Sequence, residues 1–207
     1  MRICRERVQV LERRTTMETK HAGMMESAND GIVDAINGTG DIVQATAETI
    51  TRLLATAIKD TGRLSASVTD AVADIVRGAV NGATQVGADL VLPVKGIIIG
   101  VLRCTKGVGA ETTNTISKIA NVVILDTAAV GGDLDAAATG LVVGAIRGAK
   151  ELGISVEAAA EAATTGALKA ADNVGETAVA TVRAAVMRAI HACKAGTLAT
   201  PSGSPAK

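Results

Sequence analysis

The chain has 207 residues, 48% of them apolar, and its 21 basic and 21 acidic side chains give a formal net charge of zero. It contains no phenylalanine, tyrosine or tryptophan. The balanced charge and the missing aromatic rings argue against a nucleic-acid-binding protein, which needs a basic surface and, for single strands, stacking platforms. The length is sufficient for one domain, whose core must consist of alanine, valine, isoleucine and leucine.

The first 28 residues differ from everything that follows. Basic residues alternate there with apolar ones in a weakly amphipathic pattern, as in Arg5, Arg7, Val8 and Val10. We predict that residues 1–28 form a flexible N-terminal extension. In the alternatives, the segment is an arm that binds a partner or surface, or translation starts at a later methionine and residues 1–24 are not native. No continuous apolar run follows the basic residues, so a secretory signal is not expected.

Residues 29–195 carry a pattern that recurs every 22 residues. An alanine or valine followed by a larger aliphatic residue occurs in register at Ala35-Ile36, Ala57-Ile58, Ala79-Val80, Val101-Leu102, Val123-Ile124, Ala145-Ile146, Ala167-Leu168 and Ala189-Ile190. With this residue as position 1, apolar or small residues fall at positions 1, 5, 8, 12, 16 and 19. These steps of three and four residues indicate one face of a helix. One copy of the face reads Ala79, Ala83, Val86, Leu90, Val94 and Ile97.

Glycine at position 9 predicts where each helix ends. It occurs at Gly87, Gly109, Gly131, Gly153 and Gly175, and two residues later come Asp89, Glu111, Asp133, Ser155 and Thr177. Glycine adopts the left-handed conformation that ends helices, and Asp, Ser and Thr accept hydrogen bonds from the first N–H groups of a helix. Gly-x-Asp/Ser/Thr therefore predicts a three-residue turn, with Thr112 as a substitute for the poorly capping Glu111.

Three local departures from this pattern are expected. In the first two copies the glycines come earlier, at Gly40 and Gly62, so those turns are shifted. Pro93 removes an early helical hydrogen bond, so its helix starts nearer Leu92 or is kinked.

The repeat predicts an all-α fold, an array or bundle of about seven to eight antiparallel helices. The alternative is one long helix, in which each position-9 glycine would cost about 1 kcal/mol relative to alanine. That alternative does not explain why the glycine and the capping residue occur together. Small residues four apart, Gly78/Gly82 and Gly144/Gly148, favour close packing of helix backbones, against neutral drift in a small-residue-rich sequence. The alanine-rich stretch 158–163 must also pack closely or lie in solvent on a strong helix former.

No signature of catalysis, metal binding or cofactor binding is found, so we expect a protein that is not an enzyme. His21 and His191 are the only histidines, and Cys193 lies two residues from His191, on a different side of a helix. Asp133 and Asp135 are interpreted as a cap and a surface charge. Gly107 and Gly109 lack the lysine and the spacing of a phosphate loop. Asn37-Gly38-Thr39 matches a glycosylation sequon but is interpreted as a turn.

Three scattered cysteines, Cys4, Cys104 and Cys193, are too few for a disulfide framework and fit a reducing cytoplasm, with Cys104 and Cys193 as small packing residues. The most apolar segment, Leu90 to Leu102, is interrupted by Lys95 and is too short for a conventional spanning helix. From Gly196 onward the composition predicts a disordered tail over residues 196–207.

The phrases at 144–149 (GAIRGA) and 166–171 (GALKAA), with Val174-Gly175, resemble an alanine- and glycine-rich repeat of uncharacterised bacterial proteins. This resemblance covers roughly residues 70–190 and implies no activity. A weaker resemblance is to exchangeable apolipoproteins, synucleins and perilipins, whose 22- or 11-residue repeats lie on lipid as amphipathic helices. This chain departs from them in its position-9 glycines and in lacking dense lysine flanks.

We therefore expect a non-enzymatic structural or scaffolding protein of the cytoplasm that forms a homo-oligomer, because identical helical units present similar faces at both ends of an array. The alternative is a peripheral protein whose repeats open on a membrane or lipid surface. A carrier that binds an apolar ligand between helices is a third and remote hypothesis. No nucleic acid, cofactor or small-molecule substrate is expected as a partner.

Overall fold

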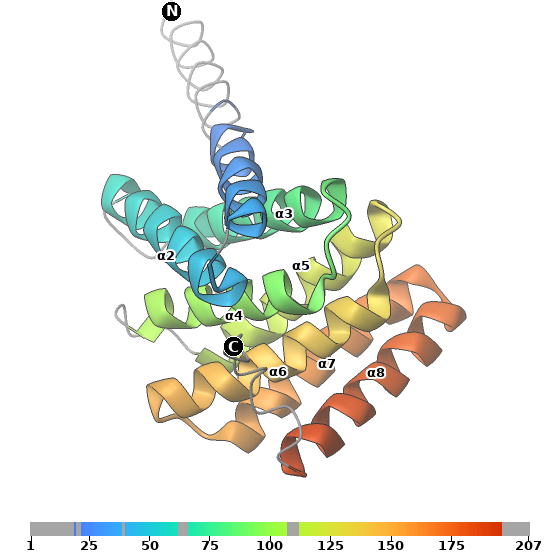
Figure 1. Ribbon diagram of the computed structural model, residues 1–207. Coiled ribbons are helices and arrows are strands. Elements are labelled where there is room, and N and C mark those ends of the chain that lie inside the picture. The colour runs from blue at the N-terminus through green and yellow to red at the C-terminus, as the bar shows by residue number, and fades with distance from the viewer. Residues whose placement is uncertain (1–18, 20–21, 39, 62–65, 107–111, 196–207) are drawn as a thin grey trace, which may run out of the picture.

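The computed structural model describes residues 19, 22–38, 40–61, 66–106 and 112–195, and it contains no strand in these ranges. Residues 22–37 are helical, and seven labelled helices follow (Figure 1): α2 (Ile42–Thr61), α3 (Ala66–Gln85), α4 (Val91–Lys106), α5 (Thr112–Ala129), α6 (Leu134–Leu152), α7 (Val156–Val174) and α8 (Glu176–Lys194). Consecutive helices run antiparallel. The described part therefore confirms an all-α fold of about seven to eight antiparallel helices and excludes one long helix.

Helices two places apart in the chain make the most extensive contacts, which sorts the helices into two layers. One layer holds α2, α4, α6 and α8, and the other holds the 22–37 helix, α3, α5 and α7 (Figure 1). Gly140, Gly144 and Gly148 of α6 lie beside residues 91, 95 and 102 of α4. Because both numbers rise together, neighbours within a layer are parallel, and the antiparallel contacts lie between the layers.

Glycines let the helices within a layer approach closely. A Cβ added at Gly140 would lie 2.7 Å from the carbonyl oxygen of Val91, and one at Gly144 would lie 3.0 Å from Cα of Lys95. Added Cβ atoms at Gly78 and Gly82 would collide with the backbone of residues 25 and 29. The predicted close packing is thus confirmed at both glycine pairs, and chance composition does not account for them.

The core lies mainly between the two layers and consists of aliphatic side chains. Its largest fully buried members are Ile32, Ile50, Leu54, Ile75, Val76, Ile97, Ile98, Leu102, Ile116, Ile119, Ile124 and Leu141. In the alanine-rich stretch of α7, Ala159 and Ala163 are fully buried, so this stretch packs closely. The helical face predicted from one copy is also buried, except for Val86, which is 37% exposed. Val86 follows the last residue of α3, where the chain has left the interface between the layers.

In three of the predicted turns the glycine and the capping residue act as expected, although only the turn between α6 and α7 has the expected three residues. Gly87, Gly131 and Gly153 have φ angles of 66°, 69° and 67°, in the left-handed region. The next residue closes each helix end, as where the N–H of Ile154 donates to the carbonyl of Ala149 at 3.0 Å. The three expected capping residues accept hydrogen bonds from the following helix: Asp89 from Val91 N, Asp133 from Asp135 N and Ala136 N, and Ser155 from Ala158 N.

The prediction for Thr177 is wrong, because Thr177 lies inside α8 and caps nothing. Gly175 alone separates α7 from α8, and its φ of 138° and ψ of 171° bend the chain without a three-residue turn. The residue before α8 is therefore this glycine, which has no side chain to accept a hydrogen bond.

The remaining expectations about boundaries have mixed outcomes. The first turn is shifted as expected, with Gly40 followed by Asp41, which accepts from Val43 N at 3.0 Å. α4 begins at Val91, so Pro93 sits in the first turn, where no helical N–H is needed. The 22–37 helix overlaps the expected extension, and Ala28 is fully buried. Gly62, Gly109, Glu111 and the expected tail at 196–207 lie outside the described residues.

Candidate functional site

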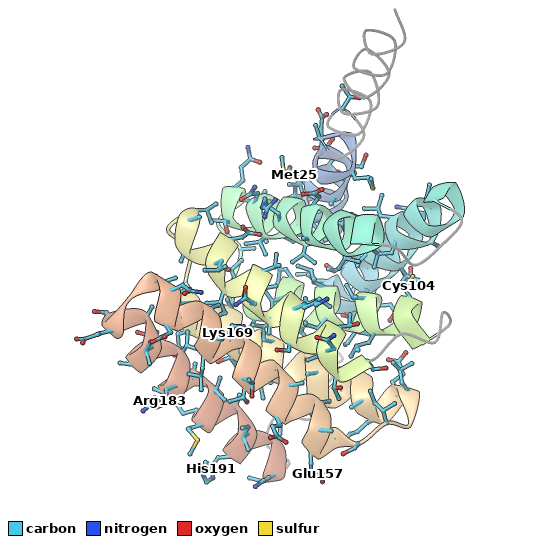
Figure 2. All side chains as sticks on the ribbon, turned by 180° about the vertical axis from the view of Figure 1, so that it is seen from behind. Met25, Cys104, Glu157, Lys169, Arg183 and His191 are labelled. Atoms are coloured by element: carbon cyan, nitrogen blue, oxygen red, sulfur yellow. The ribbon has the colours of Figure 1, made fainter. Side chains whose placement is uncertain are left out.

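The residues considered for chemistry have separate structural positions. His191 is exposed and Cys193 is half-buried in the last turn of α8, which Figure 2 shows at the edge of the array. Asp133 caps α6, and Asp135 pairs with Arg188 of α8. His21, Thr39, Gly107 and Gly109 lie outside the described residues. Among the residues that are described, no group of three or more His, Cys, Asp or Glu side chains could hold a metal ion.

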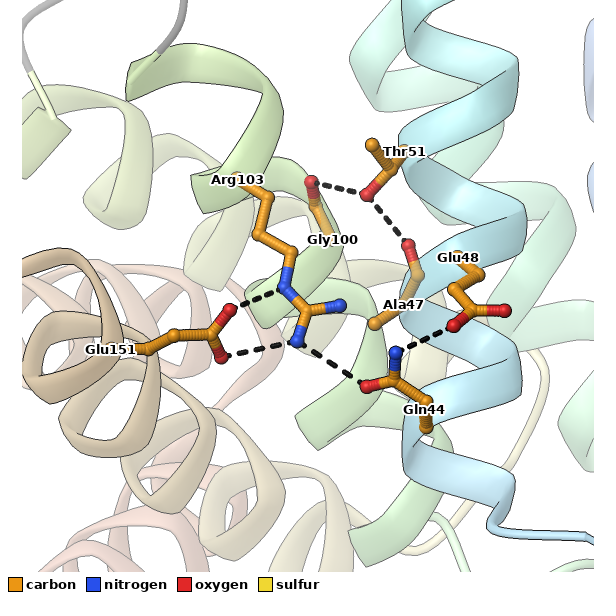
Figure 3. A network of polar contacts seen from close by, with 7 residues as sticks. All are labelled: Gln44, Ala47, Glu48, Thr51, Gly100, Arg103 and Glu151. Atoms are coloured by element: carbon orange, nitrogen blue, oxygen red, sulfur yellow. Dashed lines mark hydrogen bonds and ion pairs between the residues drawn. The ribbon is translucent and has the colours of Figure 1, made fainter.

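A polar network centred on Arg103 joins three helices of one layer (Figure 3). The Arg103 guanidinium donates from Nε and Nη2 to the two carboxylate oxygens of Glu151 on α6, at 2.6 and 3.1 Å. Nη2 also donates to Gln44 of α2 at 3.3 Å. The hydrogen bond to Glu151 raises the pKa of Arg103, so the cation is permanent. The network therefore links α4 to its two neighbours in this layer, α2 and α6.

A hydrogen bond between uncharged groups also joins α2 to α4. The hydroxyl of Thr51 donates to the carbonyl of Ala47 in its own helix at 2.7 Å and lies 3.2 Å from the carbonyl of Gly100 in α4. A Cβ at Gly100 would lie 2.7 Å from the Ala47 carbonyl oxygen, so only glycine allows this approach. These contacts hold α2 and α4 together.

Lys95 of α4 is a second charged group within this layer, and its residue is only 7% exposed. Burial lowers the pKa of Lys95, the Arg147 guanidinium lowers it further, and Asp41 opposes the change. A lysine with a lowered pKa is a common feature of functional sites. Cys193 interacts electrostatically with Lys95, but burial raises the pKa of its thiol, and no group of three or more metal-ligand side chains occurs among the described residues. The sequence shows this residue only as an interruption of an apolar run.

In the other layer, Arg77 of α3 joins α3 to α5. Its Nε donates to Oδ1 of Asp126 at 3.1 Å, and its Nη1 donates to Asp74 at 3.2 Å. Oδ2 of Asp126 is buried without a hydrogen-bond partner. Burial raises the pKa of Asp126, and the bond from Arg77 opposes this. The sequence does not reveal this pair, because the partners are two helices apart.

The cysteines behave as packing residues, as expected. Cys104 and Cys193 are free and half-buried, and both lie against the core. Burial raises the pKa of both thiols, so neither is an activated nucleophile at neutral pH. Cys4 lies outside the described residues.

The outer side of α8 forms an open groove of about 630 Å³. Its lining residues come from α8 and from the end of α7: Asp172, Gly175, Glu176, Val179, Ala180, Arg183, Ala184 and Met187. Met187 is 54% exposed, more than any other large apolar side chain of the described residues. Figure 2 shows Arg183 on this outermost helix. The groove is thus a mixed apolar and charged surface at one end of the array.

Comparison with known proteins adds no assignment. No protein-family model matches the chain, and no curated protein is significantly similar to it. The resemblance to alanine- and glycine-rich bacterial repeats therefore stays a prediction. Separately, none of the described helices is both long and apolar enough to cross a membrane.

Proposed function

We propose that the chain is a non-enzymatic structural protein of the cytoplasm, a helical repeat array that self-associates as a scaffold. One observation carries this proposal: among the described helices, α8 has a neighbour in its layer on one side only, so the array is open at this end. The interhelical ion pairs of Arg77, Arg103 and Arg188 fit the same interpretation, since each links helices two places apart. Charged groups thus serve the assembly of the array.

The array is further proposed to be built from the 22-residue repeat itself. Each repeat supplies one helix and one turn, and successive helices alternate between the layers. Such architectures bury the face of each unit against its neighbours and leave the two ends unsatisfied. Self-association is the direct way to cover an end.

Sedimentation velocity over a wide range of protein concentrations tests the proposal. We expect a concentration-dependent species heavier than the monomer, and native mass spectrometry of protein isolated from its own cells should detect the same species. A strictly monomeric particle at every concentration would contradict self-association.

Binding to a lipid surface is the second candidate, and one observation favours it. Val86, Val130 and Val174 are 37%, 40% and 43% exposed and follow one another at intervals of 44 residues. They place an apolar side chain at the C-terminal end of α3, α5 and α7 alike. However, the array buries the apolar faces that a lipid-bound helix would need, so lipid binding requires it to open. Circular dichroism separates the two: helicity that develops only with anionic vesicles would favour the lipid surface.

A further inference from the structure

The open row on α8 has a buried counterpart in α4. The row consists of Val179, Arg183 and Met187, and four repeats earlier the same positions are Val91, Lys95 and Ile99. In α4 these residues lie against Gly140, Gly144 and Gly148 of α6, and Lys95 and Ile99 are only 7% and 2% exposed. On α8 Val179 is half-buried against the core, whereas Arg183 and Met187 are exposed and no described helix covers them. The α8 row therefore has the repeat positions of a helix-packing surface, but no described helix packs on it.

The charged residues of the groove are arranged so that the groove of one copy is complementary to the groove of a second copy. Glu176 and Arg183 are seven residues apart, which places them on the same side of α8, two turns from each other. Val179 and Ala180 lie midway between them, and Ala180 and Ala184 are small enough to let another helix approach. Arg188, further along, is already paired with Asp135 of α6. If a second α8 lay antiparallel across this midpoint, each Glu176 would face the Arg183 of the other copy.

We propose that a second copy of this chain docks on the α8 groove, with the two α8 helices antiparallel about a twofold axis near Val179 and Ala180. The inference rests on the proposed self-association and specifies its interface. Met187 of each copy then covers the α7–α8 turn of the other, near Asp172 and Gly175. Such an isologous contact closes at two subunits, because the same patch is used on both sides.

The other end of the array argues against head-to-tail stacking. The 22–37 helix exposes Glu26, Asp30 and Asp34 at intervals of four residues. In a stacked array this helix would continue the layer of α7, whose exposed charged side chains are three acidic and one basic: Glu157, Glu161, Lys169 and Asp172. Acidic groups would then oppose acidic groups, which disfavours that partner arrangement. Two α8 grooves in the antiparallel arrangement would instead bring opposite charges, Glu176 and Arg183, together.

Charge exchange tests the interface. Arg183→Glu places two pairs of acids in contact, and Glu176→Arg places two pairs of bases in contact, so each variant alone should dissociate at least about tenfold more readily than wild type. A mixture of the two variants should form a heterodimer, because every facing pair is again of opposite charge. The double variant Glu176→Arg/Arg183→Glu should dimerise with itself. Sedimentation velocity and native mass spectrometry measure all four, and circular dichroism verifies that each variant is folded.

Arg52→Glu serves as the matched control, since it reverses an exposed arginine on α2 at the opposite end of the array. It should leave association unchanged. If the α8 variants associate like wild type, or if the mixture fails to restore association, the α8 interface is wrong although the scaffold proposal stands. If the wild-type chain is monomeric throughout, both proposals fall.

Discussion

At the scale of single residues, the glycines inside helices determine how close the helices of a layer can lie. Gly166 of α7 is, with Gly78, one of the two tightest cases, because an added Cβ would overlap the carbonyl oxygen of Ser117 in α5 and lie 2.8 Å from its carbonyl carbon. Gly166→Ala should lower the free energy of unfolding by about 1–3 kcal/mol, since a backbone cannot move aside as a side chain can. Urea denaturation followed by circular dichroism measures the change.

Gly23→Ala is the control for this substitution, because Gly23 is also helical but has nothing within 4 Å of an added Cβ. Alanine there should be neutral or stabilise by up to about 1 kcal/mol, the ordinary difference in helix propensity. Equal effects at both sites would show that Gly166 is not a close contact.

Lys95 shows what a charge inside a layer does to stability. Its pKa is lowered by burial and by Arg147, so the unfolded chain binds this proton more tightly than the native chain. Wild-type stability should therefore gain from this residue as pH rises from the lowered pKa toward the ordinary lysine value of about 10.5. Lys95→Met keeps an unbranched side chain and removes the charge, so it should stabilise the protein at pH 7 by roughly 1 kcal/mol.

The advantage of Lys95→Met should shrink as the pH approaches the ordinary lysine pKa, because the wild-type side chain then loses its charge in both states. Denaturation of the two proteins at neutral and at alkaline pH measures how the difference in their stability changes. A variant less stable than wild type at pH 7 would mean that the ammonium stabilises the layer.

At the scale of helices, the start signals can be tested one by one. Asp133 accepts hydrogen bonds from Asp135 N at 2.9 Å and Ala136 N at 3.1 Å, whereas Thr177 occupies the matching repeat position but is exposed within α8. Asp133→Ala should cost about 1 kcal/mol of stability, the usual effect of losing a cap. Thr177→Ala should cost nothing and gain slightly from helix propensity. Chemical denaturation of both variants decides whether capping depends on geometry or on sequence position.

These two residues also show how far the sequence could be interpreted. Helix ends depend on a glycine and a capping side chain within a few residues, so the local pattern predicted the turns at Gly87, Gly131 and Gly153. It failed at Thr177 because Gly175 took an extended positive-φ conformation that requires no further turn residues. The pairing of Arg103 with Glu151 depends on which helices are neighbours in space, and no local pattern contains that information. The α8 groove was missed for the same reason, since Arg183 and Met187 look like an ordinary helix surface until the layers are known.

At the scale of the whole molecule, an array of helices has an interior and two ends, and their stabilities should differ. Within the part of the chain that the structure describes, α4, α5 and α6 have neighbours on both sides, whereas α8 has a layer neighbour on one side only. Local opening is easiest where the fewest contacts must be broken. In dilute protein, amide hydrogen exchange should therefore be slowest in α4–α6 and faster in α8. Uniform protection along the chain would instead indicate that the array unfolds only as one unit.

If α8 is the interface, raising the protein concentration should change the amide hydrogen exchange of α8 alone. Burial of the groove by a second copy removes the free end, so exchange in α8 should slow with concentration while α4–α6 stay unchanged. Arg183→Glu should abolish the concentration dependence and leave the dilute profile intact, because Arg183 is exposed and has no role within the array. Protection that instead grows at the 22–37 helix would place the contact at the acidic end, where the exposed carboxylates predict repulsion.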